Sequence, residues 1–172
     1  EASTSPNGAR RPIGAYREPP LHPRVFAAKL ARKIFTNGKS DCELVAKLYA
    51  DTLSGALGGA LHLTFAGCNW GDEELRRLTE VLPFALAAQG LYLSANSQIG
   101  EPGLAALASA LRDGAAPKMS VIYLDGHAMR KADELRTVCA ARGIRLAGFG
   151  LEAAASQQKN TNSKKNITSH HM

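Results

Sequence analysis

Apolar residues recur along the chain in a fixed order, as a short alternating run, then a turn, then a helical spacing. In the segment GLYLSANSQIGEPGLAALASAL, residues 90–111, Leu91 and Leu93 alternate with more polar residues, as in a half-buried strand. Leucines then follow at helical spacing, and Pro102 suits the first turn of a helix. The segment therefore predicts a strand, a turn and a helix.

The same order occurs in the neighbouring segments. Strands are predicted to begin at Leu63, Leu91, Ile122 and Ile144, in steps of 28, 31 and 22 residues. The first two copies align once one residue is inserted between the Cys/Asn and Trp/Ile positions: Leu63, Phe65, Cys68, Trp70, Leu75, Leu78 and Leu82 correspond to Leu91, Leu93, Asn96, Ile99, Leu104, Leu107 and Leu111. Units of this length bury their apolar faces against one another, so we expect parallel, stacked strands and a core position for Trp70.

A period near 28 residues that combines L-x-L-x-x-N/C with a following I-G and a leucine-spaced helix closely resembles the leucine-rich repeat family, in its ribonuclease-inhibitor-like form. The resemblance covers about residues 57–150. It implies an α/β fold, a short solenoid with parallel strands on the concave side and helices on the convex side. In such a fold the Asn96 amide would hydrogen-bond the backbone of adjacent turns, Cys68 is an accepted substitute at that position, and His127 is unusual there.

Residues 25–56 are predicted to form a helical cap on the first repeat. In VFAAKLARKIF, residues 25–35, one helical face is basic and the other is apolar. The apolar face consists of Phe26, Ala27, Leu30, Ala31, Ile34 and Phe35. Such a helix packs on its own domain, the commoner outcome, or binds a membrane surface or an acidic groove. A second helix is expected to start at a capping box of Ser40 and Glu43 and to end near residue 54, before a run of glycines.

The two ends of the chain carry its positive charge. Residues 1–40 hold eight basic and two acidic side chains, and residues 156–172 hold three lysines and no acid. Residues 41–155 hold ten basic and thirteen acidic side chains. Basic ends on a mildly acidic body indicate an anionic partner, such as RNA, an acidic protein or a lipid surface, or else tails that only keep the protein soluble.

Residues 1–24 have the composition of a segment that is disordered alone and ordered by a partner, and residues 151–172 form a polar, basic tail. If a neighbouring subunit orders this N-terminal arm, the arginines would meet carboxylates or phosphates and the tyrosine would enter an apolar pocket. The predicted partner-binding residues of the arm are Arg10, Arg11, Tyr16, Arg17 and Arg24.

Cys42, Cys68 and Cys139 are widely spaced, with no C-x-x-C and no paired histidine spacing. Neither a disulfide framework nor a zinc site is predicted, and we expect no metal and no cofactor. A reducing, intracellular compartment is the simpler interpretation, either the cytoplasm or an organelle reached after removal of a leader. No apolar run approaches the ~20 residues of a membrane-spanning helix, so we expect a soluble protein for which peripheral membrane contact stays open.

Catalytic chemistry is not predicted. Ser94, Asp125 and His127 are residue types of a catalytic triad, but no G-x-S-x-G elbow is present, and the last two are better explained as turn residues. The acidic run 72–74 begins a predicted helix, where carboxylates favour the helix dipole, and Asp72 is expected to cap that helix. We therefore expect a protein that is not an enzyme.

The repeats predict a binding surface on the concave side, because the residues between inward-pointing leucines face outward. Tyr92 and Tyr123 would lie on neighbouring strands about 5 Å apart. Such a pair either anchors a partner or simply covers the sheet. The predicted partner-binding residues of this face are Thr64, Tyr92, Ser94, Tyr123, Asp125 and Arg145.

The expected function is that of a non-enzymatic protein–protein interaction module, plausibly a small accessory or structural subunit of a larger multiprotein assembly. Its partners would be the other protein subunits. The alternative is an RNA- or ribonucleoprotein-associated protein that uses its basic arms for electrostatic contacts.

Overall fold

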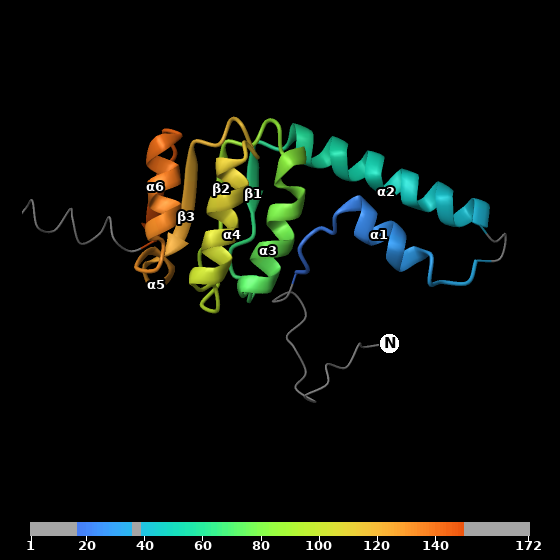
Figure 1. Ribbon diagram of the computed structural model, residues 1–172, viewed down its shortest axis with the longest axis horizontal. Helices are drawn as coiled ribbons and strands as arrows, with labels where there is room; N and C mark the ends of the chain where they lie inside the picture. The colour runs from blue at the N-terminus through green and yellow to red at the C-terminus, as the bar shows by residue number, and fades with distance from the viewer. Residues whose placement is uncertain (1–16, 36–38, 150–172) are drawn as a thin grey trace, which may run out of the picture.

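The computed structural model describes residues 17–35 and 39–149, which form a mixed α/β fold (Figure 1). Four strands make one sheet: β1 (His62–Thr64), β2 (Gly90–Tyr92), β3 (Val121–Asp125) and β4 (Arg145–Phe149). They are hydrogen-bonded in chain order, and each pair is parallel. The predicted parallel pairing is confirmed.

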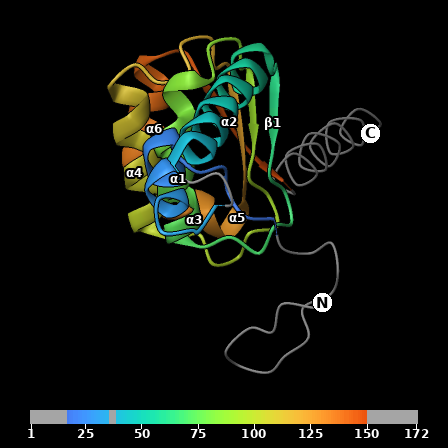
Figure 2. The ribbon, with the colours of Figure 1, turned by 90° about the vertical axis from the view of Figure 1, so that its right-hand side faces the viewer.

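Each pair of successive strands is linked through a segment that contains helices. The helices are α1 (Pro23–Leu30), α2 (Lys39–Gly59), α3 (Asp72–Val81), α4 (Glu101–Arg112), α5 (Gly126–Met129) and α6 (Asp133–Ala141), and the short 3-10 helix η1 is Leu82–Phe84. Helices α3, α4 and α6 pack side by side on one face of the sheet (Figure 2). Helices α1 and α2 pack on each other and extend beyond the sheet (Figure 1).

The core lies between the sheet and these three helices. Leu63, Leu91 and Ile122 are register partners across β1, β2 and β3, and all three are buried. Trp70 is fully buried and stacks on Phe65 with 4.6 Å between ring centroids, which confirms its predicted core position.

The helix ends follow local rules. Pro102 lies in the first turn of α4, as predicted. Gly114 and Gly143 follow the ends of α4 and α6 with φ of +91° and +68°. Glycine adopts this left-handed conformation without the penalty of a Cβ atom, which explains why the two helices stop there.

The register of the last strand differs from the prediction. Leu146, not Ile144, is the partner of Ile122. The backbone N–H of Ile144 donates to the Cys139 carbonyl at 2.8 Å, so Ile144 completes the turn that ends α6 instead of starting the strand row. Because the shift is two residues, Arg145 keeps its predicted face of the sheet.

Asn96 joins two successive units, as the family resemblance implies. Its side-chain amide donates to the carbonyls of Phe65 and Leu93, each at 2.8 Å, and its Oδ1 accepts the backbone N–H of Trp70 at 2.9 Å. The residue is only 1% exposed. These bonds satisfy backbone groups of both turns that burial would otherwise leave unpaired.

Asp72 was predicted to cap its own helix, and this prediction is wrong. Gly71 precedes α3, and its backbone N–H donates to the Glu74 carboxylate at 3.0 Å. Asp72 Oδ1 instead accepts the N–H groups of Gly100 at 2.7 Å and Gly103 at 3.0 Å, at the start of α4. The parallel stacking of units brings the carboxylate to the next helix, where it satisfies two free donors.

We expect Asp72→Ala to lower the free energy of unfolding by about 1 to 2 kcal/mol, because α4 loses its side-chain cap. Asp72→Asn retains Oδ1 as an acceptor and should lose less. Urea unfolding followed by far-UV circular dichroism measures both variants. Equal stability of the wild-type and alanine proteins would show that these two bonds contribute nothing net.

The helical cap departs from the prediction in three places. Helix α1 ends at Leu30, so Ile34 does not continue its apolar face and is 101% exposed. Helix α2 begins at Lys39, one residue ahead of the predicted capping residue Ser40. It also continues past residue 54 to Gly59, because this extension places Leu57 in the core and that burial offsets the poor helix propensity of the glycines.

Residues 17–22 pack on their own domain, so this part of the predicted arm is not a free tail. The buried indole of Trp70 donates through Nε1 to the Arg17 carbonyl at 2.5 Å. The Tyr49 hydroxyl donates to the Leu21 carbonyl at 2.8 Å and accepts the Leu21 N–H at 3.0 Å. Aromatic side chains with polar atoms need such partners when buried, and this need fixes the segment. The rest of the predicted arm, with Arg10, Arg11 and Tyr16, and the tail 151–172 lie outside the described residues.

Candidate interaction surface

The sheet face opposite α3, α4 and α6 carries the predicted binding residues, and we call it the open face. Side chains alternate along each short strand, so that Leu91 points into the core while Tyr92 is partly exposed on the open face. Thr64, Tyr92 and Tyr123 are register partners on three neighbouring strands. Thr64 is exposed, and the two tyrosines are half-buried.

Tyr92 and Tyr123 form a parallel stack on this face. Their ring centroids are 4.8 Å apart, and the ring planes differ by 9°. The predicted proximity of the two residues is confirmed. It follows from the in-register parallel pairing, which sets equivalent residues one strand spacing apart.

The stack is extended on both sides. His62 of β1 meets the Tyr92 ring edge-on, with 5.9 Å between centroids. Arg145 of β4 places its guanidinium carbon 5.7 Å from the centre of the Tyr123 ring and donates through Nη2 to the Tyr123 hydroxyl at 3.1 Å. We call His62, Tyr92, Tyr123 and Arg145 the stacked row, which crosses all four strands.

Gly90 makes room for the first part of the stacked row. A Cβ atom at this position would lie 2.8 Å from His62 Nδ1 and 3.0 Å from Tyr92 Cε2. Both distances are too short for ordinary packing, so a side chain at Gly90 would displace the two rings. Sequence reasoning attributed no specific role to His62 and did not single out Gly90. The available signal was alternation, which places His62 on the same face as Thr64 two residues later.

Asp125 has a structural role that its prediction as a partner-binding residue did not include. Its two carboxylate oxygens accept the backbone N–H groups of Ala95 at 2.8 Å and Asn96 at 3.1 Å. Ala95 has a φ of +58°, an uncommon conformation for a residue with a side chain. Asp125 therefore holds the turn after β2 in place, as its interpretation as a turn residue anticipated.

Ser94 also belongs to that turn. It is half-buried, and its backbone carbonyl accepts the Gly67 N–H at 2.9 Å. A partner of the open face would therefore contact the stacked row and Thr64. Asp125 and Ser94 support the loop beside these residues.

Arg17 lies against its own domain and not in an extended arm. Its guanidinium carbon is 5.6 Å from the centre of the Phe65 ring, beside the first strand. Arg24 lies in the first turn of α1, where its backbone N–H donates to His22 Nδ1 at 3.2 Å. A shallow groove of about 440 Å³ separates residues 17–20 from the end of α2 and from β1.

Ion pairs elsewhere on the described surface lie within α2, α3 and α6, and one joins α4 to α6 through Arg112 and Glu134. The Arg76 guanidinium beside Glu73, with 2.8 Å between Nη2 and Oε1, holds the pKa of that carboxyl below its usual range. The three cysteines are free thiols, and burial raises the pKa of the Cys139 thiol. Within residues 17–35 and 39–149, no cluster of three or more side chains is arranged to hold a metal ion. None of the helices in the same ranges is long and apolar enough to cross a membrane.

Comparison with protein-family models, with curated proteins and with solved structures finds no match for this chain.

Proposed function

We propose that this chain is a leucine-rich-repeat type of interaction module, a short solenoid that binds another protein subunit through its open face, which would be the concave side. Under this proposal it is a non-enzymatic accessory or structural subunit of a larger assembly. The in-register stacking of Leu63, Leu91 and Ile122 and the bridging role of Asn96 support the solenoid.

The stacked row is the observation that carries the binding role. Core packing does not require aromatic rings on the open face, yet the chain places two tyrosines there and leaves Gly90 without a side chain beside them. Tyrosine combines a large contact area with few rotatable bonds, and stacking fixes the rings before a partner arrives. A preformed aromatic surface of this kind is typical of binding hot spots.

The stacked row favours a protein partner over single-stranded RNA. Base stacking needs a free ring face. Tyr92 lies between His62 and Tyr123, and Tyr123 lies between Tyr92 and Arg145, so each tyrosine has a neighbour on both sides. The ring edges and hydroxyl groups remain for a partner, and these fit the side chains and backbone of another protein.

Replacing Tyr92 and Tyr123 together by alanine tests this function. We expect the double variant to bind its co-purifying partner at least about tenfold more weakly, because hot-spot tyrosines typically contribute more than ~1 kcal/mol each. The free energy of unfolding should fall by about 0.5 to 1.5 kcal/mol for the lost stacking, together with the contribution of the area that the two half-buried rings cover. Affinity purification followed by titration of the identified partner measures the first effect, and thermal unfolding measures the second.

The matched control is Arg76→Ala with Arg112→Ala, which removes two exposed side chains from the helix-covered side. This control should bind like the wild type. Unchanged binding by the tyrosine variant would move the interface elsewhere. Loss of the partner from the wild-type complex after ribonuclease treatment would favour the RNA-associated alternative.

A further inference from the structure

Helices α1 and α2 form a hairpin that is anchored to the rest of the domain through the C-terminal part of α2. Phe26 stacks on Tyr49 with 3.8 Å between ring centroids, which holds the two helices together. Leu53 and Leu57 of α2 are buried in the core of the domain. The other end of the hairpin projects beyond the sheet and its helices (Figure 1). We call residues 24–35 and 40–48 the distal hairpin.

The distal hairpin exposes most of the large apolar side chains that face solvent in the described residues. Five of the seven lie here: Val25, Ile34, Leu44, Val45 and Leu48. Ile34 is 101% exposed, and Leu44 and Leu48 are 56% and 55% exposed. Single exposed leucines are ordinary, but a concentration of apolar side chains on one projecting element marks an interaction site.

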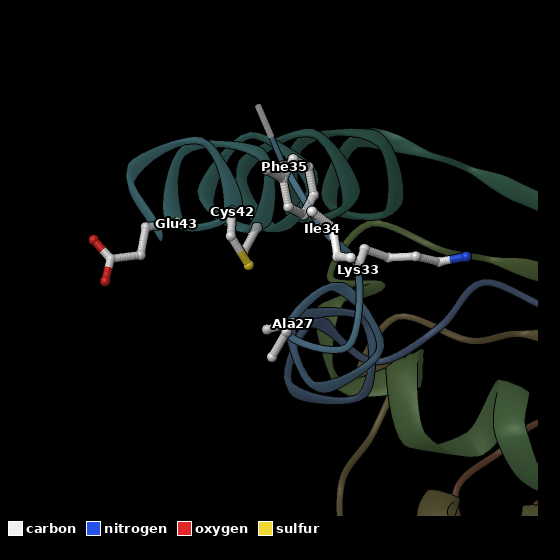
Figure 3. A pocket seen from close by; sticks show the side chains of 8 residues that line it. Ala27, Lys33, Ile34, Phe35, Cys42 and Glu43 are labelled. Atoms are coloured by element: carbon white, nitrogen blue, oxygen red, sulfur yellow. The ribbon is translucent and has the colours of Figure 1, made fainter. Parts of the chain in front are cut away.

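An apolar groove of about 560 Å³ runs between the two helices of the distal hairpin. Its lining consists mainly of small or apolar side chains: Ala27, Ala31, Ile34, Phe35, Cys42 and Ala46. Figure 3 shows Ala27, Ile34, Phe35 and Cys42 between the helices, while the charged ends of Lys33 and Glu43 point away in opposite directions. Alanine and cysteine walls leave space for a guest helix to approach the backbone closely.

Helix α1 and the residues that follow it are positively charged, and Lys33 lies at the groove itself. Arg24, Lys29, Arg32 and Lys33 are exposed, and residues 23–35 contain no acidic side chain. In the part of the chain that the structure describes, none of these four cations forms an ion pair. A guest that covers the groove would therefore gain from carboxylates placed opposite α1.

The shape of the apolar surface favours a helix over a flat lipid surface. At 100° per residue, Leu44 and Leu48 lie on the side of α2 opposite Cys42 and Ala46. Leu44 and Leu48 therefore lie outside the groove, and Ile34 is the exposed apolar side chain that a guest in the groove would cover. A groove with apolar walls from two helices fits the apolar stripe of an amphipathic helix better than a flat lipid surface.

We propose that the groove of the distal hairpin docks an amphipathic helix of a partner protein, with apolar residues in the groove and acidic residues over α1. This inference goes beyond the binding role of the open face, because the stacked row and the groove belong to different parts of the chain. A protein with both sites would bind two different subunits of its assembly.

Two synthetic peptides test the proposal directly. They share one leucine stripe over about five helical turns and differ only in their polar face, which is glutamate in one and lysine in the other. Fluorescence anisotropy with the full-length chain should show binding of the acidic peptide and at least about tenfold weaker binding of the basic one. Ala46→Arg, which fills the groove, should abolish binding of the acidic peptide. Leu86→Arg, at an exposed leucine on another part of the surface, should leave it unchanged.

A second variant, Lys29→Glu with Arg32→Glu and Lys33→Glu, changes only exposed side chains and therefore tests the charge without disturbing the hairpin packing. It should reverse the preference between the two peptides. Equal binding of both peptides to the wild type would overturn the acidic assignment, and binding of neither would overturn the docking site. Co-sedimentation of the chain with phosphatidylserine-containing vesicles, abolished by the charge reversal and without peptide binding, would make the distal hairpin a membrane contact instead.

Discussion

Replacing Asn96 by alanine is expected to lower the free energy of unfolding by about 2 to 4 kcal/mol. The amide is buried and bonded to four backbone groups from two successive units, the weakest being the Ser94 carbonyl at 3.4 Å. Removal of the side chain leaves the Trp70 N–H and the carbonyls of Phe65 and Leu93 without these partners, and each buried unsatisfied group costs roughly 1 to 3 kcal/mol. Water partly enters the vacated space and bonds some of these groups, so the expected loss is smaller than the sum of their separate costs.

Chemical denaturation monitored by the fluorescence of Trp70, the single tryptophan of the chain, measures this loss. Ser97→Ala is the matched control, because Ser97 is an exposed residue next to Asn96. A variant at position 96 that unfolds at the wild-type midpoint would mean that the two turns do not depend on this bridge.

The second large effect is expected for Leu93→Ala, with a loss of about 2 to 5 kcal/mol. Leu93 is fully buried directly after β2, and its backbone N–H donates to the Tyr123 carbonyl at 2.9 Å. The substitution keeps this backbone bond and removes only side-chain atoms, so the loss reports packing between neighbouring units. The cavity left behind adds to the lost burial, because stacked units are held on both sides and collapse poorly.

Leu86→Ala provides the comparison, because it removes the same atoms from a leucine that is 58% exposed. Urea titrations should give a free energy of unfolding for Leu93→Ala that is lower than that for Leu86→Ala by most of the expected loss, and hence a lower midpoint. Similar midpoints would show that Leu93 is not packed as described.

The strands and their pairing could be predicted because the signal is local and repeated. Leu91 and Leu93 alternate with more polar residues, and the same alternation recurs at Leu63 and Ile122. Equal spacing of equivalent residues then implies parallel, in-register pairing. The end of the array was harder to predict, because Ile144 is equally suitable for a strand and for the turn after α6, and only the hydrogen bond to Cys139 distinguishes them.

Long-range contacts that do not follow from the repeat pattern could not be predicted. Residues 17–22 have the composition of a mobile segment, and no local pattern shows that the indole of Trp70 needs the Arg17 carbonyl. The capping rule for Asp72 considers one helix at a time, whereas its carboxylate serves the helix of the next unit.

The open face could likewise be predicted in part from the sequence. Tyr92 and Tyr123 occupy equivalent positions in successive units, so parallel pairing alone brings them together. Gly90 contributes by having no side chain, and an absent side chain leaves no hydrophobic or polar pattern to read.

The bond from Asp72 to α4 also limits how this protein can change in length during evolution. Repeat arrays grow or shrink by duplication or loss of a unit, provided that the units are interchangeable. Here they are not: Glu101 stands in the second unit where Asp72 stands in the first, and among the described residues no side chain caps the start of α6. An inserted copy of the second unit would present the longer Glu101 side chain where Asp72 accepts the two N–H groups of the next helix. We expect homologous chains to vary at their termini and to keep the number and order of these units.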